Sequence, residues 1–299
     1  DAVVFNFSNP MQRICHAVTT KFPDLRFIGL CHEIKSMNRQ LPDLMETEMH
    51  NIEYRAAGLN HLSILLEARY KNTGKDGYPI IKQNFDAYFS DLVNKHDAKP
   101  SKPGAERGVF RKLFKTYGYL PITTDSHLGE YIQWAYSVAD HDAILDFYDN
   151  YKEKCLAFYD NKISYDHYFD LKNLNTHERV VPIIEGILSD SAYEEPAINI
   201  PNNGYIECLP KDIVVEVPGI INKSGISGIS FKNYPAAFGS LLNSQSGVIQ
   251  MTTDAVLNSS KHSAYLALLA DPVVNDSHQA ERLLNNMLKT QSKFLGYLK

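Results

Sequence analysis

The first 31 residues constrain the fold more than any other part of this 299-residue chain. They hold an apolar run, AVVFNF, an amphipathic stretch, MQRICHAVTTKF, and a second apolar run, RFIGLC. Asn9 and Pro10 precede the amphipathic stretch as N-cap and first helical residue, a combination typical of helix starts. A strand, a helix and a strand with short connections form a βαβ unit, whose strands are parallel. The sequence therefore predicts an α/β fold that begins within a parallel sheet.

The remainder of the chain predicts a larger, helix-rich α+β region. After a short helix over 33–44, IEYRAAGLN and HLSILLEARY predict two strands that meet at residues 58–61. A second β-rich segment, 193–231, contains a hairpin signal at Asn202-Asn203-Gly204. The Lys/Pro/Gly-rich stretch 97–108 predicts a surface loop. Apolar residues at helical spacing recur in the segments 83–96, 107–119, 130–159, 180–190 and 278–298.

Charge and composition exclude several classes of protein. The net charge is −5 and the sequence pI is about 6.1, so the chain has no reason to bind nucleic acid. It has no run of eighteen apolar residues and no signal-peptide pattern at its start, so we expect neither a membrane span nor secretion. The cysteines match no disulfide framework and predict free thiols in a reducing compartment, the cytoplasm; they are Cys15, Cys31, Cys155 and Cys208.

Three short motifs fall where predicted strands end. They are Asn9-Pro10, Cys31-His32-Glu33 and Gly58-Leu59-Asn60-His61. Ligands of open α/β sheets bind beyond the carboxyl ends of the strands, so we expect an amide, a thiol and imidazoles in one crevice. Thiol and imidazole can hold a metal with open positions for water and substrate. On spacing alone, a buried cysteine and an ordinary surface histidine explain the same residues equally well.

A wider set of motifs resembles glycoside hydrolase family 4, the NAD- and metal-dependent glycosidases. The residues that carry the resemblance are NFSNP, GLCHE and AGLNH, followed by GYLPITTDSHLGEY, IPNNGYIECLPKDIVVEVPGIINKSG and a late LLADP. The resemblance implies two parts. Residues 1–35 would be the C-terminal part of a Rossmann-like nucleotide-binding domain, whose N-terminal half is expected to be absent. Residues 36–299 would be the catalytic region, similar to the C-terminal part of lactate dehydrogenases.

The resemblance also implies residue roles. Cys31 and His61 match the family's two ligands for a divalent metal, usually manganese. Asn9 matches a residue that reaches substrate and NAD near the nicotinamide, and Asn60 matches a sugar-binding residue. The implied reaction oxidises the sugar at C3 with NAD⁺, polarises the ketone with the metal, removes the C2 proton, expels the aglycone, adds water and returns the hydride.

The base that removes the C2 proton is left open among three residues of TTDSHLGEY. They are Asp125, His127 and Tyr131. A tyrosine or histidine base would need help from a cation to work near neutral pH. The structural alternative is that Tyr131 and Trp134 face the core and that Glu130 is a solvated residue of a helix's first turn.

The residues after the metal cysteine indicate the substrate. Cys-His-Glu resembles the subgroup that acts on α-galacturonides, with α-galactosides or α-glucuronides as alternatives, and makes His32 a substrate-binding candidate. A uronate would need a cationic partner, for which Arg13 is a candidate, although an exposed helix arginine explains it as well. Because Glu33 would repel an anionic sugar, we expect its side chain to turn away and hold a supporting hydrogen bond.

The sequence also departs from the family. It contains no G-x-G-x-x-G motif, and Gly225-Ile-Ser-Gly228 lacks the spacing, so we expect this chain alone to bind NAD weakly. Family 4 enzymes are homo-oligomers, and we expect the same here. Two other functions fit part of the pattern: a 2-hydroxy acid dehydrogenase, which has no use for a Cys31–His61 pair, and a truncated, non-catalytic relative. Metal binding would decide against both.

Overall fold

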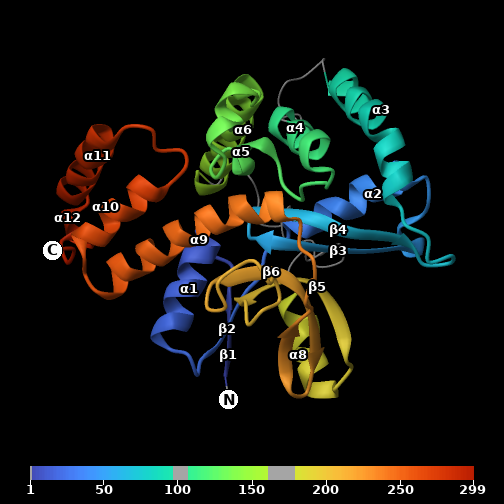
Figure 1. Cartoon of the computed structure of the whole chain (residues 1–299), viewed down its shortest axis with the longest axis horizontal. Coiled ribbons are helices and arrows are strands. Elements are labelled where there is room, and N and C mark those ends of the chain that lie inside the picture. The colour runs from blue at the N-terminus through green and yellow to red at the C-terminus, as the bar shows by residue number, and fades with distance from the viewer. Residues whose placement is uncertain (1, 97–106, 161–178) are drawn as a thin grey trace.

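The computed structural model describes residues 2–96, 107–160 and 179–299. Its strands form one sheet in the order β1-β2-β5-β6-β3-β4, with β7 paired to β6 (Figure 1). Among the described strands only β1 and β2 run parallel; the other pairs are antiparallel. The predicted βαβ unit and α/β class are therefore confirmed. The strands are β1 Val3–Asn6, β2 Arg26–Gly29, β3 Ile52–Leu59, β4 Leu62–Tyr70, β5 Tyr193–Pro201, β6 Val214–Asn222 and β7 Gly225–Gly228.

Helices account for most of the remaining described residues. Helix α1 packs against β2, β5 and β6, and α9 crosses α1 on its way to α10, α11 and α12 (Figure 1). Their bounds are α1 Met11–Lys21, α2 Met37–Met45, α3 Tyr78–His96, α4 Gly108–Tyr117, α5 Asp125–Leu128, α6 His141–Tyr159, α8 Val180–Ser189, α9 Ala236–Leu257, α10 Lys261–Ala270, α11 Ser277–Thr290 and α12 Ser292–Leu295. Short 3₁₀ helices are η1 Glu33–Ser36, η2 Met49–Asn51 and η3 Gln133–Ser137. Within the described residues, none of the helices has the length and apolar character that crossing a bilayer requires.

Three predicted boundaries differ from the structure. Helix α1 begins at Met11, with Pro10 as N-cap, one residue later than predicted. The helix predicted over 130–159 is divided, because the Asp140 carboxylate accepts a hydrogen bond from the Ala143 backbone N–H (3.0 Å) and starts α6 as a separate helix. Strands β5 and β6 pair as expected, but residues 202–213 connect them as a longer loop in which the buried Asn202 side chain holds backbone groups. Of the predicted loop at 97–108, residues 97–106 lie outside the described residues.

An aromatic cluster joins α3 to α4. The Phe110 ring is fully buried, 5.1 Å from the Phe89 ring and 6.4 Å from the Phe85 ring between centroids. Phe85 also contacts Phe114 at 4.1 Å. Rings that share one apolar volume cannot be truncated without leaving a cavity. This cluster therefore fixes α4 in the molecule.

We expect Phe110→Ala to lower the free energy of unfolding by about 3–5 kcal/mol, the range for truncating a buried phenylalanine. Tyr136→Ala is the control, because Tyr136 is 80% exposed, and it should change stability by no more than about 0.5 kcal/mol. Urea unfolding followed by circular dichroism measures both. Equal effects of the two substitutions would contradict the packing described for α4.

Candidate metal centre and active site

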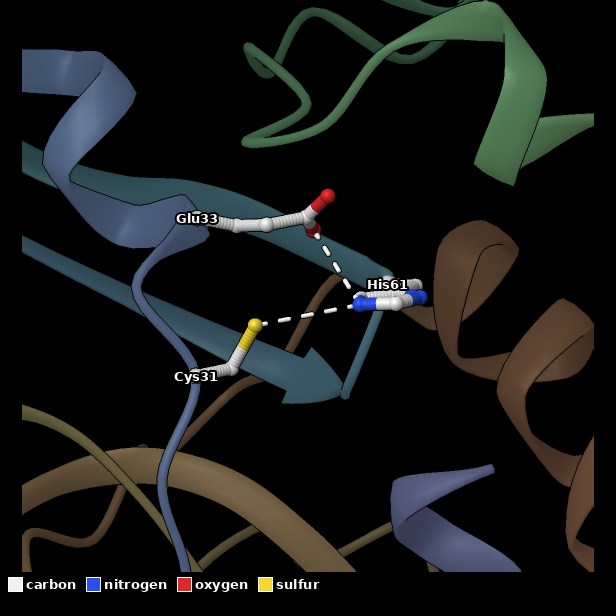
Figure 2. Close-up of side chains that lie close together, drawn as sticks. All are labelled: Cys31, Glu33 and His61. Atoms are coloured by element: carbon white, nitrogen blue, oxygen red, sulfur yellow. Dashed lines mark hydrogen bonds and ion pairs between the residues drawn. The ribbon is translucent and has the colours of Figure 1, made fainter. Parts of the chain in front are cut away.

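Cys31 and His61 come together from separate parts of the sheet. Cys31 lies two residues beyond the end of β2, and His61 lies in the turn between β3 and β4. The Cys31 Sγ and His61 Nε2 atoms are 3.7 Å apart (Figure 2). His61 adopts a left-handed backbone conformation with φ of 62°, which is uncommon for a residue with a side chain. A conformation of this kind is kept only where its surroundings enforce it.

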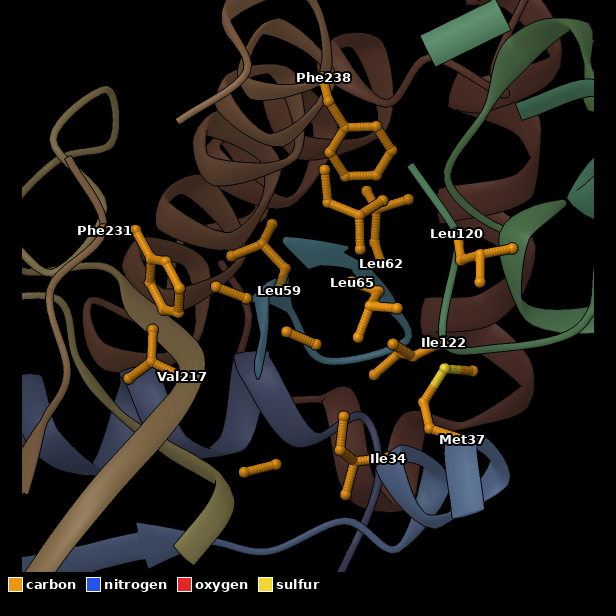
Figure 3. Packing of buried hydrophobic residues seen from close by; sticks show 14 of the residues in the cluster. Ile34, Met37, Leu59, Leu62, Leu65, Leu120, Ile122, Val217, Phe231 and Phe238 are labelled. Carbon is orange, nitrogen blue, oxygen red and sulfur yellow. The ribbon is translucent and has the colours of Figure 1, made fainter. Parts of the chain in front are cut away.

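Packing enforces the β3–β4 turn. Leu59 and Leu62, on either side of it, are both buried in the main apolar cluster, where Leu65, Met37 and Phe238 also pack (Figure 3). Gly58 is required as well, because a Cβ there would collide with the Leu62 carbonyl oxygen. The turn that carries His61 therefore has little freedom to move.

Glu33 turns towards this pair rather than away from it, contrary to the prediction. Its Oε1 accepts the expected supporting hydrogen bond, from Thr123 Oγ1 (2.8 Å), but its Oε2 lies 3.9 Å from His61 Nε2 (Figure 2). Within the part of the chain that the structure describes, Glu33 Oε2 is buried and has no hydrogen-bond partner. The ligand atoms of Cys31, Glu33 and His61 all lie within 4.8 Å of one another. A cation would satisfy the orphaned oxygen, so the donor set fits a metal ion.

Burial sets the protonation states of the three groups. Burial first, then Glu216 and Glu33, raise the pKa of the Cys31 thiol to about 12. Burial, then His127 and His32, lower the pKa of His61 to about 3, so its imidazole is neutral and can offer a lone pair. Burial raises the pKa of Glu33 to about 7. A metal ion would have to displace the thiol proton as it binds.

His127 belongs to the same cluster. Its ring lies on the His61 ring with centroids 4.1 Å apart. Its Nε2 is 3.3 Å from Glu33 Oε1, and its Nδ1 is 3.5 Å from Glu130 Oε1. An imidazole held between two carboxylates beside the metal pair is well placed to move a proton.

Tyr131 lies in the neighbourhood of the same charges. Burial first, and then Glu130, raise the pKa of Tyr131, whereas the positive charge of Arg13 lowers it. The Gln245 side chain donates from Nε2 to the Tyr131 carbonyl (3.3 Å). The half-buried Tyr131 packs against the core, as the structural alternative expected.

The geometry argues against Asp125 as the base. Its side chain is fully buried, and its two oxygens accept hydrogen bonds from the backbone N–H groups of Val109 (2.8 Å) and Phe110 (2.9 Å). These N–H groups belong to the first turn of α4, where a helix has no partners of its own. Asp125 therefore holds the start of α4.

Of the predicted substrate residues, Asn60 lies directly before His61, as the motif places it, and is buried. It is 2% exposed and donates from Nδ2 to Glu216 Oε2 (2.7 Å). This position beneath the metal pair argues against direct contact with sugar. His32 and Asn9 are exposed, and Asn9 Oδ1 accepts from the Met11 N–H (3.2 Å) at the start of α1.

The sequence interpretation missed the role of two charged residues here. The side chain of Glu33 points towards His61, and not away from it as predicted, because Glu33 begins the 3₁₀ helix η1. The sequence does not indicate which way such a turn directs its side chains. The family motifs that contain Glu216 assign it no role. Its signal was present, because a charged residue inside the apolar run IVVEVP is exceptional in a buried strand.

The chain matches two family models. The model "Family 4 glycosyl hydrolase C-terminal domain" matches residues 56–274, and the model "Family 4 glycosyl hydrolase" matches residues 1–47. This chain belongs to glycosyl hydrolase family 4. Family 4 relatives are glycosidases, which decides against the 2-hydroxy acid dehydrogenase alternative.

The relatives that resemble this family 4 chain are named for different activities. An α-glucosidase of Erwinia rhapontici is 41% identical over all of this chain and 69% of its own length. An α-galactosidase of Bacillus subtilis is 28% identical over 91% of this chain and 61% of its own. An α-galacturonidase of Thermoanaerobacterium saccharolyticum is 27% identical over 99% and 67%. The chain thus spans about two thirds of the length of these relatives.

Solved structures agree on the fold. A 6-phospho-α-glucosidase from gut microorganisms, in complex with NAD and Mn²⁺, has a TM-score of 0.74 at 20% identity, covering 98% of this family 4 chain and 68% of that chain. A 6-phospho-β-glucosidase of Thermotoga maritima, with manganese, NAD⁺ and glucose-6-phosphate, has a TM-score of 0.70 at 21% identity, covering 100% and 67%. These similarities establish the predicted fold, a Rossmann-like sheet followed by a helix-rich region.

If Asp125 holds α4, Asp125→Asn should lower the free energy of unfolding by about 1.5–3 kcal/mol, the range for hydrogen bonds to a charged group. The exposed Asp142 in the first turn of α6 provides the control, and Asp142→Asn should cost no more than about 0.5 kcal/mol. Denaturant unfolding measures both. An Asp125→Asn protein of unchanged stability that has lost all turnover would instead identify Asp125 as a catalytic residue.

Proposed function

We propose that this chain carries the catalytic centre of an NAD- and divalent-metal-dependent α-glycosidase, which cleaves by C3 oxidation, C2 deprotonation and elimination. The observation that carries the proposal is the Cys31–His61 pair with the Glu33 oxygen aimed at it, in a chain of family 4. These three residues would hold the metal. When bound, a divalent ion would act as a Lewis acid on sugar oxygens.

The sulfur ligand bears on which metal binds. Manganese prefers oxygen ligands, so zinc, iron or nickel would compete for a site that contains Cys31. Glu33 favours manganese, because it adds a carboxylate oxygen to the sulfur and nitrogen donors. The same sulfur must stay reduced, which supports a cytoplasmic enzyme.

The chain offers fewer candidate residues for binding NAD than for binding the metal. Its sequence contains no G-x-G-x-x-G motif, and Asn9, at the start of α1, is the residue that we assign near the nicotinamide. When bound, NAD would take up and return the hydride of C3. We keep residues 1–35 as this chain's share of the nucleotide-binding domain and 36–299 as the catalytic domain.

His127 and Tyr131 share the proton chemistry in this proposal. We assign the C2 base to His127, because its imidazole lies on the ligand His61 and between two carboxylates. Tyr131 is the alternative. Its raised pKa means that it would need the metal or Arg13 to ionise its phenol.

An α-glucoside is the substrate that we favour. The relative at 41% identity is an α-glucosidase. The Glu33 carboxylate supports the same choice, because a neutral sugar can donate a hydroxyl hydrogen bond to it, whereas a uronate or a sugar phosphate would meet a like charge. A cation between Cys31 and His61 would keep Glu33 ionised.

An α-galacturonide is the second candidate, on separate observations. Cys31-His32-Glu33 resembles the α-galacturonidase subgroup, and relatives of that activity are 27% and 24% identical. Arg13 supports it, because its positive charge lowers the pKa of the Tyr131 phenol and could likewise favour an anionic sugar. α-Galactosides and α-glucuronides are further alternatives within the family.

A homo-oligomer completes the proposal. The outer face of α8 exposes a row of apolar side chains at helical spacing, Val181, Ile184 and Leu188. Apolar rows of this kind suit a contact with another subunit.

Hydrolysis of a chromogenic α-glucoside, with the matching α-galacturonide and α-galactoside alongside, tests the function. The protein is translated from its complete reading frame and assayed with NAD⁺, Mn²⁺ and a thiol reductant, each omitted in turn. We expect cleavage of the α-glucoside that is lost without NAD⁺ or Mn²⁺. Cleavage of the galacturonide alone would support the second candidate. No turnover of any of the three, with no metal bound, would favour the non-catalytic relative.

The base is tested by His127→Gln and Tyr131→Phe in the same protein. The variant that removes the base should lower kcat by about 10²–10⁴-fold, the usual contribution of general base catalysis. His141→Gln and Tyr136→Phe are matched controls at exposed positions, and both should keep full turnover. A His127→Gln enzyme with normal kcat would transfer the role to Tyr131.

A further inference from the structure

A row of directly paired residues crosses the sheet beneath the metal pair. Gly29 on β2 pairs with Asn199 on β5, Asn199 pairs with Glu216 on β6, Glu216 pairs with Gly58 on β3, and Gly58 pairs with Ser63 on β4. Residues that are directly paired across a sheet point to the same face. A Cβ atom at Gly29 would collide with Asn199, among others, and one at Gly58 would crowd Ser63, so both positions need glycine. The row is therefore Gly–Asn–Glu–Gly–Ser.

The row connects the two strands that deliver the metal ligands. Gly29 lies two residues before Cys31, and Gly58 lies three residues before His61. Strands β2 and β3 do not touch, since β5 and β6 lie between them. The distance between Cys31 and His61 is therefore set through the two intervening strands.

Hydrogen bonds run along the whole row. Asn199 Nδ2 donates to the Gly29 carbonyl (3.4 Å) and to Glu216 Oε2 (3.2 Å). Glu216 Oε2 also accepts from Asn60 Nδ2 (2.7 Å), and its Oε1 accepts from Ser63 Oγ (3.1 Å). Strands β2, β5 and β4, and the β3–β4 turn that contains Asn60, are thus joined to the Glu216 carboxylate directly or through Asn199.

Burial of this carboxylate is costly unless donors surround it. Glu216 is 3% exposed, and a buried carboxylate without hydrogen bonds is strongly unfavourable. Three donors from three other segments satisfy it. One of them, Asn60, directly precedes His61 in the chain. Glu216 therefore holds the side chain of the residue that directly precedes the ligand His61.

We propose that Glu216 is a positioning residue for the metal centre, which holds Cys31 and His61 at the spacing that binds a divalent cation by fixing the Asn60 side chain and the β3–β4 turn. The proposal rests on the proposed metal-binding function of Cys31 and His61. A merely structural Glu216 would contribute to stability but not to the affinity for metal.

Glu216→Gln separates the two roles. Glutamine keeps the shape but removes the negative charge, so the hydrogen bonds from the Asn60 and Asn199 amides become weaker neutral ones and hold the Asn60 side chain less firmly. We expect the chain to bind Co²⁺ about 10–100-fold more weakly, as is typical when a supporting partner of a metal ligand is lost. Titration with Co²⁺ alone, followed by the sulfur-to-cobalt charge-transfer absorption, reports both affinity and the Cys31 bond.

Glu195→Gln is the matched control. Glu195 is a second buried glutamate, on β5, and pairs with Arg179 (3.1 Å) outside the row. The Glu195→Gln protein should unfold at a lower urea concentration than the native chain but keep the same Co²⁺ affinity and charge-transfer absorption. Asn199→Ser is a second variant, which removes the link between Glu216 and β2, and its affinity should fall in the same direction.

The outcomes are distinct. Weaker Co²⁺ binding by Glu216→Gln and Asn199→Ser, with Glu195→Gln unchanged, supports the proposal. Unchanged Co²⁺ affinity and absorption in a folded Glu216→Gln or Asn199→Ser protein would overturn it while leaving the metal-binding function intact. A native chain that binds no Co²⁺ would overturn both.

Discussion

The pairing of β5 with β6 keeps the ends of β2 and β3 at a fixed separation, because these two strands lie between them. Cys31 follows β2 and His61 follows β3, so the 3.7 Å between their ligand atoms depends on strands that contribute no ligand of their own. The width of two strands, β5 and β6, therefore separates β2 from β3. On these two strands Asn199 and Glu216 form hydrogen bonds with each other, and Glu216 also accepts one from Asn60.

Local features of the fold were predictable from the sequence, because local rules govern them. The Asn9-Pro10 helix start, the parallel pairing of β1 with β2 and the turn before His61 follow from capping residues, short connections and apolar runs. The insertion of β5 and β6 between β2 and β3 was not predictable in this way. It depends on pairing between residues as distant as Asn60 and Glu216, which are 156 positions apart.

The candidate site shows the same difference between features that the sequence indicates and features that depend on long-range contacts. Cys31 and His61 were identified through a family resemblance, and the structure brings them together as that resemblance implied. The direction of the Glu33 side chain and the burial of Asp125 and Asn60 depend on three-dimensional surroundings that spacing does not encode. The direction of Glu33 bears on the substrate that we propose, because a carboxylate that faces the pair would repel an acidic sugar.

The strand order has a consequence for the time at which the site appears during synthesis. Cys31 and His61 leave the ribosome early, but β5 and β6 are made much later, at Tyr193–Pro201 and Val214–Asn222. Contacts between such distant segments form late in folding, because a long loop must first close. A nascent chain that ends before β6 therefore contains both ligand residues and no site, and it has no preformed place to capture the wrong metal.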